Sequence, residues 1–163
     1  MTVTKEKTII MKYFDKINKN SSYFLSDIHE PNDNSIFLEI KKSTTSDVVQ
    51  NIMVGKIGLN EKRRIEVDKK SEYFTIQFDG YVSYHVIEEG FINFQDNKDE
   101  YKAGEFSVFR VYSKSSYLDF ILKETIANDI FPDEMKHYGL YCMNHVVHII
   151  SLTEPKIELI DCT

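Results

Sequence analysis

The sequence predicts a single α+β domain over residues 1–163, built on a largely antiparallel β-sheet. Apolar residues recur at helical spacing near the N-terminus and again near residue 116, whereas elsewhere they alternate with a period of two. Short turns join the expected strands, which favours antiparallel pairing. The length of 163 residues suits one domain, and only 6 Gly and 3 Pro are present, so no linker divides the chain.

Two helices are expected, one at the N-terminus and one in the C-terminal half. Over residues 5–18 apolar side chains form one helical face, and lysines fill much of the remaining surface. This face would consist of Ile9, Ile10, Tyr13, Phe14 and Ile17. Over residues 116–127, Ser115 or Ser116 would cap a second helix, with Asp119 in its first turn. The buried stripe of the second helix would consist of Leu118, Ile121, Leu122 and Ile126.

Strands are expected where apolar and polar residues alternate or where β-branched residues form a short run. These stretches are 36–40, 48–57, 65–67, 73–78, 81–86, 106–112, 138–143, 146–152 and 157–159, with a shorter one at 91–94. Asp79-Gly80 between two alternating stretches predicts a two-residue hairpin with a type I′ turn. The run at 146–152 is apolar on both faces, which favours a central strand, and 157–159 would form an edge strand.

Charge and cysteine content narrow the class of protein. There are 20 Lys and Arg against 26 Asp and Glu, a formal net charge of −6, which argues against a nucleic-acid partner. Cys142 and Cys162 are too few for a disulfide-stapled scaffold, so both are expected to be free thiols in a reducing compartment. No signal-peptide-like run and no stretch of ~20 apolar residues is found. We therefore expect a cytoplasmic protein without membrane association.

Four residues near the C-terminus have the chemistry of a zinc site: His137, Cys142, His145 and His148. Side chains alternate along a strand, so His145 and His148, three positions apart, would point to opposite faces. Cys142 and His145, considered as a thiol nucleophile and its base, have no identifiable third residue to orient the base. The sequence also contains no phosphate-binding loop and no G-x-S-x-G or H-E-x-x-H motif. We therefore expect no metal, no cofactor and no enzymatic activity.

Carboxylates and aromatic rings are interleaved within residues 85–105, whose net charge is −4. The carboxylates would steer a basic protein partner and the rings would supply buried contacts. The predicted partner-binding residues are Glu88, Glu89, Phe91, Phe94, Asp96, Asp99, Glu100 and Tyr101. Residues 124–134 add four carboxylates and no basic residue. The alternative interpretation is a solvated loop that contributes only solubility.

Three stretches of the second half of the chain are rich in aromatic residues: Tyr81-Val-Ser-Tyr-His85, Tyr112-Ser-Lys-Ser-Ser-Tyr-Leu-Asp-Phe120 and His137-Tyr-Gly-Leu-Tyr-Cys-Met-Asn-His-Val146. At these stretches the chain resembles a group of small uncharacterised Firmicutes proteins. The resemblance covers about residues 70–155, and its motifs are apolar and aromatic. Some members of the group are encoded beside polymorphic toxins, where immunity proteins are common. The resemblance implies a cytoplasmic protein that inhibits a toxin stoichiometrically without a cofactor, and it assigns no binding residue.

These features predict a protein that binds another protein, most specifically a basic, nuclease-type toxin whose active site the acidic surface would occlude. A small-ligand domain or enzyme is the alternative, with Tyr81, Ser83 and His85 as polar groups of a pocket on one strand face. A structural subunit of an assembly is a third possibility, indicated by a long exposed strand at residues 156–160. The sequence leaves the oligomeric state open.

Overall fold

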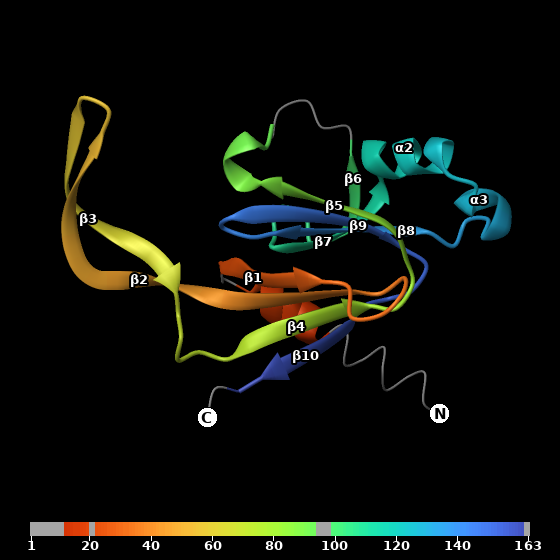
Figure 1. The fold of residues 1–163 in the computed structure, drawn as a ribbon, viewed down its shortest axis with the longest axis horizontal. Coiled ribbons are helices and arrows are strands. Elements are labelled where there is room, and N and C mark those ends of the chain that lie inside the picture. The colour runs from red at the N-terminus through yellow and green to blue at the C-terminus, as the bar shows by residue number, and fades with distance from the viewer. Residues whose placement is uncertain (1–11, 20–21, 94–98, 162–163) are drawn as a thin grey trace.

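The computed structural model of the chain describes residues 12–19, 22–93 and 99–161. Within these residues the strands form two five-stranded sheets whose neighbouring strands run antiparallel. The two sheets pack face to face, and a helix lies over the outer face of one of them (Figure 1). This arrangement confirms the predicted α+β class and the largely antiparallel strands, which lie in two layers.

The first sheet has the strand order β1-β2-β4-β10, with β3 paired to the far half of β2. Its strands are β1 (Tyr23–His29), β2 (Ile36–Val54), β3 (Ile57–Val67), β4 (Tyr73–Phe78) and β10 (Lys156–Ile160). The second sheet has the order β5-β9-β8-β7-β6. Its strands are β5 (Tyr81–Glu88), β6 (Glu100–Ala103), β7 (Phe109–Lys114), β8 (Lys136–Tyr141) and β9 (His145–Ser151). As predicted, β9 is an interior strand and β10 is an edge strand.

Both predicted helices are present. Residues 12–18 are helical, Ile17 is fully buried, and the ring of Phe14 lies 5.4 Å from that of Phe109, so this helix packs on the sheets. Ile9 and Ile10 lie outside the described residues. The remaining helices are a 3-10 turn, η1 (Glu89–Phe91), and two α-helices, α2 (Ser116–Glu124) and α3 (Ala127–Ile130). None of the described helices combines the length and the apolar content that crossing a membrane requires.

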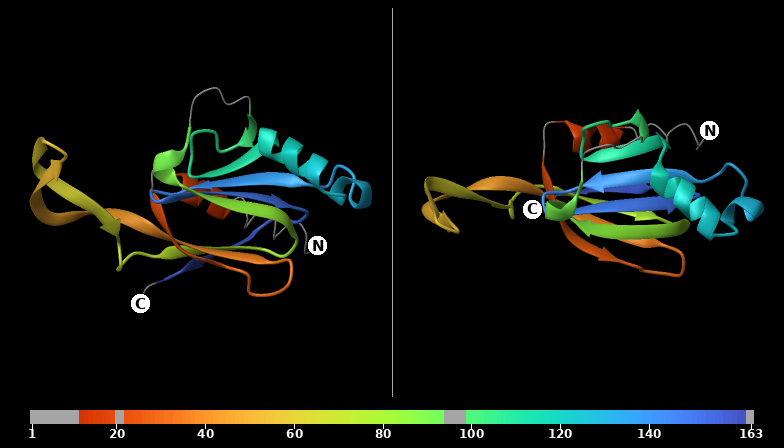
Figure 2. Two further views of the ribbon diagram at one scale, coloured as in Figure 1. Left: turned by 45° about the horizontal axis from the view of Figure 1, so that its top comes forward. Right: turned by 90° about the horizontal axis from the view of Figure 1, so that it is seen from above.

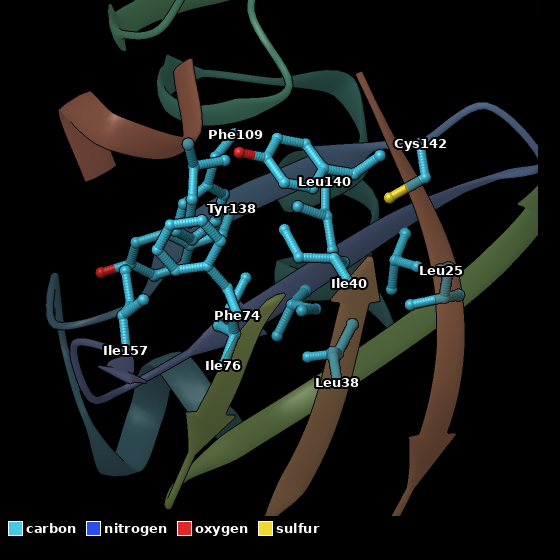
Figure 3. Packing of buried hydrophobic residues seen from close by; sticks show 14 of the residues in the cluster. Leu25, Leu38, Ile40, Phe74, Ile76, Phe109, Tyr138, Leu140, Cys142 and Ile157 are labelled. Carbon is cyan, nitrogen blue, oxygen red and sulfur yellow. The ribbon is translucent and has the colours of Figure 1, made fainter. Parts of the chain in front are cut away.

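The main hydrophobic core lies between the two sheets. The alternation predicted for residues 36–40 and 73–78 is confirmed, because every second side chain is buried there. The inward-facing residues of these stretches are Ile36, Leu38, Ile40, Phe74, Ile76 and Phe78. Figure 3 shows several of them directed toward Phe109, Tyr138 and Leu140 of the second sheet. Each such side chain contributes about 1.5–3 kcal/mol relative to exposure, so this core is the main stabilising feature.

The predicted hairpin at Asp79-Gly80 is wrong. β4 pairs with β2 and β10, whereas β5 pairs with β9, so these two residues carry the chain from one sheet to the other. Gly80 does not adopt the positive φ of a type I′ turn, and its carbonyl accepts a hydrogen bond from the Leu152 N–H. Both strands bury one face in the same core. Apolar and polar residues therefore alternate in the same way whether the two strands pair in a hairpin or belong to two facing sheets, and the alternation does not distinguish these arrangements.

Several other boundaries differ from the predicted ones. Residues 36–54 form the single strand β2, where two strands are expected, and the short strands β1 and β6 are not predicted. In β1 the pairing register shifts between Leu25 and Asp27, which interrupts the alternation that would reveal a strand. Phe91 belongs to η1 instead of a strand, and Phe94 lies outside the described residues. α2 ends at Glu124, so Ile126 lies beyond it and is 69% exposed.

Candidate functional site

The feature that extends farthest from the two sheets is the hairpin formed by the far half of β2 and by β3. Lys42 is the last residue of β2 that pairs with β1, and residues 43–67 continue beyond it (Figure 1). We call residues 43–67 the arm. Its turn lies at Gly55 and Lys56, where Gly55 has a φ of 62°. Figure 2 shows the arm standing clear of α2 and of the second sheet in both further views.

The arm exposes apolar side chains. Seven of them are between 37% and 68% exposed: Val48, Val49, Met53, Val54, Ile57, Leu59 and Ile65. Near the tip, Ile52 pairs with Leu59. Two positions farther along, Val54 pairs with Ile57, so these four side chains share one face. Contiguous exposed apolar surface of this kind marks an interaction site, whereas single exposed residues do not.

The outer part of the arm is basic, and we call its residues 49–64 the arm tip. The arm tip contains four basic side chains and one carboxylate, in a chain whose net charge is −6. The basic residues are Lys56, Lys62, Arg63 and Arg64, and all four are exposed. Among the residues that the structure describes, no carboxylate forms an ion pair with any of them. The arm tip therefore combines an apolar face with unpaired positive charge.

A second group of polar and aromatic side chains lies between α2 and the outer face of the second sheet. We call it the histidine–tyrosine cluster, and its members are His85, Tyr112, Tyr117, His137, Tyr141 and His148. Strand pairing places His85 directly beside His148, and Gly139 on the other side of His148. A Cβ at Gly139 would lie 3.0 Å from the rings of Tyr112 and Tyr141, so glycine makes room for both rings here.

Hydrogen bonds connect this cluster to the start of α2. The Leu118 N–H donates to the Ser115 hydroxyl oxygen (2.9 Å), which makes Ser115 the N-cap, one of the two predicted candidates. The same oxygen lies 2.6 Å from Nδ1 of His137. Nε2 of His137 lies 2.9 Å from Nδ1 of His148, and the ring of Tyr112 stacks on His137 at 3.9 Å. The helix cap and two strands are thus joined through one imidazole.

The environment holds the histidines in their neutral form. Burial, followed by repulsion from His148 and His85, lowers the pKa of His137 to about 2. Burial and His85 lower the pKa of His148 to about 4, against an opposing effect of Asp99. Burial alone lowers the pKa of His85. A neutral imidazole both donates and accepts one hydrogen bond, which suits the donor–acceptor pairing between His137 and His148.

Replacing Ser115 tests the link between the helix cap and the histidines. Ser115→Ala is expected to lower the free energy of unfolding by about 2 kcal/mol, because it removes the cap and leaves Nδ1 of buried His137 without its partner. Ser116→Ala is the matched control, since that exposed hydroxyl makes a single, long hydrogen bond among the described residues, to Asp99 at 3.4 Å. Urea denaturation of both variants provides the measurement. Equal losses in the two variants would contradict this role of Ser115.

The residues predicted to line a small-ligand pocket do not come together. Ser83 and His85 join the histidine–tyrosine cluster, where the Ser83 and Tyr117 hydroxyls lie 2.8 Å apart. Tyr81 packs instead against the inter-sheet core, because the register of β5 shifts between Tyr81 and Ser83. Two hollows lined by described residues, of about 200 and 240 Å³, lie beside Arg110 and beside Lys16. Both are smaller than the roughly 300–1,000 Å³ of typical ligand pockets.

The residues with zinc-site chemistry are also separated. Cys142 is a free thiol inside the core between the sheets, and burial raises its pKa to about 12. His137 and His148 belong to the histidine–tyrosine cluster on the outer face, and His145 pairs with Glu88 across strands. Within the described part of the chain, no group of three or more His, Cys, Asp or Glu side chains is arranged to hold a metal ion. A protonated, buried thiol is a packing group and not a nucleophile.

The structure divides the predicted partner-binding residues into two groups. Glu88, Glu89 and Phe91 are exposed around η1, and the Phe91 side chain is 84% exposed. The second group lies near α2 and consists of Asp99, Glu100 and Tyr101. There Asp99 accepts a hydrogen bond from the Ser116 N–H at 2.9 Å, Glu100 lies 3.8 Å from Lys114, and the Tyr101 ring packs on Tyr112. Phe94 and Asp96 lie outside the described residues.

Sequence reasoning does not identify the arm as a site, although it predicts strands within it. The sequence pattern that could have identified the arm is the mixture of apolar and basic residues over residues 48–65. A strand that buries one face would instead show regular alternation of apolar and polar residues. No protein-family model, curated protein or solved structure matches the chain. The geometry of the arm and of the histidine–tyrosine cluster is therefore the basis for assigning a function.

Proposed function

We propose that this protein is a non-enzymatic protein-binding domain that contacts its partner through the arm. The observation that carries the proposal is the apolar face at the arm tip, where Val54 and Ile57 lie opposite each other and are 58% and 66% exposed. A two-stranded ribbon is only marginally stable alone in water. A partner that covers this face would bury apolar area and hold the ribbon in place.

The histidine–tyrosine cluster supports the non-enzymatic part of the proposal. Both ring nitrogens of His137 are used, by Ser115 and by His148. The hydroxyls of Tyr112 and Tyr141 bond to each other at 2.7 Å, and the guanidinium of Arg110 lies 3.4 Å from the centre of the Tyr141 ring. These polar groups bond to one another, and the bonds from Ser115 through His137 to His148 join the start of α2 to the sheet.

The narrower form of the proposal is a cytoplasmic immunity protein that neutralises a basic, nuclease-type toxin. The turn at η1 supports it, since the exposed Phe91 ring is separated by Gly90 alone from two exposed carboxylates, Glu88 and Glu89. Carboxylates attract the cationic groups with which a nuclease binds phosphate, and an exposed ring supplies an anchoring contact. In this form the toxin would contact the turn as well as, or instead of, the arm.

Quantitative capture from the native cytoplasm tests both forms. The baits are the wild-type chain, an arm variant with Val54→Thr and Ile57→Thr, and a turn variant with Glu88→Gln, Glu89→Gln and Phe91→Ser. The Thr substitutions retain β-branching, so they remove apolar surface while keeping a residue suited to a strand. We expect at least one protein to be captured stoichiometrically by the wild type and lost by the arm variant.

Phe106→Ser is the matched control, because Phe106 is 87% exposed but lies on neither surface. It is expected to capture the same proteins as the wild type. A basic partner lost by the turn variant, and able to stop growth when it is expressed alone, would support the immunity form. A set of captured proteins that is identical for all four baits would contradict the proposed function.

A further inference from the structure

A second set of exposed apolar side chains lies on and around α3, and Figure 1 places α2 and α3 at the end of the molecule opposite the arm. It consists of four side chains on α2, on α3 and in the residues that flank α3, each between 39% and 69% exposed: Phe120, Ile126, Ile130 and Phe131. We call these four residues the α3 patch. Three of the four residues follow the end of α2 at Glu124, so they do not continue the buried stripe marked by Ile121, and Phe120 lies on the exposed side of α2.

The charge around the α3 patch is opposite to that of the arm tip. Residues 119–134 contain five carboxylates and a single lysine, whereas residues 49–64 contain four basic side chains and one carboxylate. The carboxylates are Asp119, Glu124, Asp129, Asp133 and Glu134, and all are exposed. Within the described parts of the chain, none of them takes part in an ion pair. Each surface thus has the apolar content and the charge that complement the other.

We propose that the arm tip of one copy of this chain docks on the α3 patch of a second copy. This inference rests on the proposed function and identifies the partner as the protein itself. Figure 1 places the arm and the helices α2 and α3 at opposite ends of the long axis of the molecule, so the contact forms between copies and not within one. The interface joins two different surfaces, so in a pair of copies one copy has a free arm and the other has a free α3 patch. Further copies can bind to these free surfaces, and association continues into a closed ring or an open chain.

Complementary charge predicts how the association responds to salt. Opposite charges increase the rate of encounter and are screened when the Debye length falls from ≈ 10 Å at 0.1 M salt to 3 Å at 1 M. At 1 M salt, the contact between the apolar faces of the arm tip and the α3 patch remains. We therefore expect the weight-average mass to rise with protein concentration at low salt, and to rise less at 1 M salt.

Sedimentation velocity on the full chain and on two variants tests the proposal. The arm variant carries Val54→Thr and Ile57→Thr, and the patch variant carries Ile126→Gln and Ile130→Gln. The four residues are exposed, so the substitutions leave the core intact. Each variant alone is expected to sediment as a monomer of 19.1 kDa at concentrations where the wild type associates. The control variant, Phe106→Ser, is expected to associate like the wild type.

Mixing the two variants distinguishes this contact from a symmetric one. The arm variant retains an intact α3 patch and the patch variant retains an intact arm, so an equimolar mixture is expected to form a species of two chains and no larger one. A wild type that stays monomeric throughout would overturn the inference. Association that the patch variant leaves unchanged would overturn it in favour of arm-to-arm pairing. Association that the arm variant leaves unchanged, or that the mixture fails to restore, would overturn it too.

The failure of this inference is distinguishable from failure of the proposed function. Suppose that the wild type stays monomeric, and that it captures another protein which the arm variant does not capture. This inference would then be wrong, but the arm would still be the binding site for that other protein. A wild type that associates through the arm, while all four baits capture the same proteins, would support this inference and contradict the binding of a different protein through the arm.

Discussion

Lowering the pH from 7 to 5 is expected to reduce the free energy of unfolding by about 2 kcal/mol for each of His137 and His148. Burial lowers the pKa of His137 to about 2 and that of His148 to about 4, whereas in the unfolded chain both titrate near 6.5. Below pH 6.5 the unfolded chain therefore binds protons that the folded chain excludes. The stability is fully present above pH 6.5 and is lost progressively as the pH falls toward the folded-state values.

Urea denaturation at half-unit steps between pH 7 and 5 measures this loss. The window lies above the ordinary pKa values of carboxyl groups, and the pKa values of Glu39, Asp68 and Asp79 are lowered further in the folded chain, so carboxylates contribute little to the change. His148→Gln is expected to remove about half of the pH dependence, whatever its effect on stability at pH 7. His29→Gln removes an exposed histidine and serves as the control. An unfolding free energy that is constant over this window would show that the cluster accepts protons without cost.

Gly104→Ala is expected to destabilise the protein by about 3 kcal/mol or more. Gly104 has a φ of 75°, in the left-handed region that disfavours residues with a Cβ. A Cβ at this position would also overlap the carbonyl oxygen of Phe109 and lie 3.1 Å from the Phe14 ring. The turn that begins β7 and the N-terminal helix would therefore both have to move.

Gly55→Ala is the matched control for this prediction. Gly55 also has a positive φ, of 62°, but a Cβ there would meet no atom within 4 Å. Its replacement is expected to cost about 1–2 kcal/mol, the value for backbone strain alone. The difference between the two variants in thermal or urea denaturation then measures the steric overlap at Gly104. Equal losses would show that the turn before β7 yields without resistance.

Elements that are determined by neighbouring residues could be predicted from the sequence, whereas elements that depend on contacts with distant parts of the chain could not. The N-terminal helix and the strand β9 depend on spacing and composition within a few residues, and the sequence predicts them. For the cap of α2 the sequence offers Ser115 and Ser116, and the structure selects Ser115. The strand β1 is missed because a register shift within it breaks the alternation. The hairpin at Asp79-Gly80 is predicted wrongly because both of its strands face one core, from two different sheets.

The candidate surfaces show the same division. The acidic, aromatic stretch at residues 85–105 is visible in the sequence, but only the fold shows that Asp99 and Tyr101 are engaged with α2 and Tyr112 while Phe91 is exposed. Ser83 and His85 are predicted to share a face, and they do, whereas Tyr81 is turned to the core by a shift of register. The arm itself depends on where β1 and β4 stop pairing with β2, which no local pattern records.

By itself, the sequence determined the α+β class, the antiparallel pairing and which faces of most strands are buried, because hydrophobic periodicity is a property of neighbouring residues. Only the tertiary structure decided which strands belong to which sheet, where three histidines meet beneath α2, and which apolar residues remain without a covering element. These outcomes depend on contacts between residues far apart in the chain, and many different pairings satisfy the same local alternation.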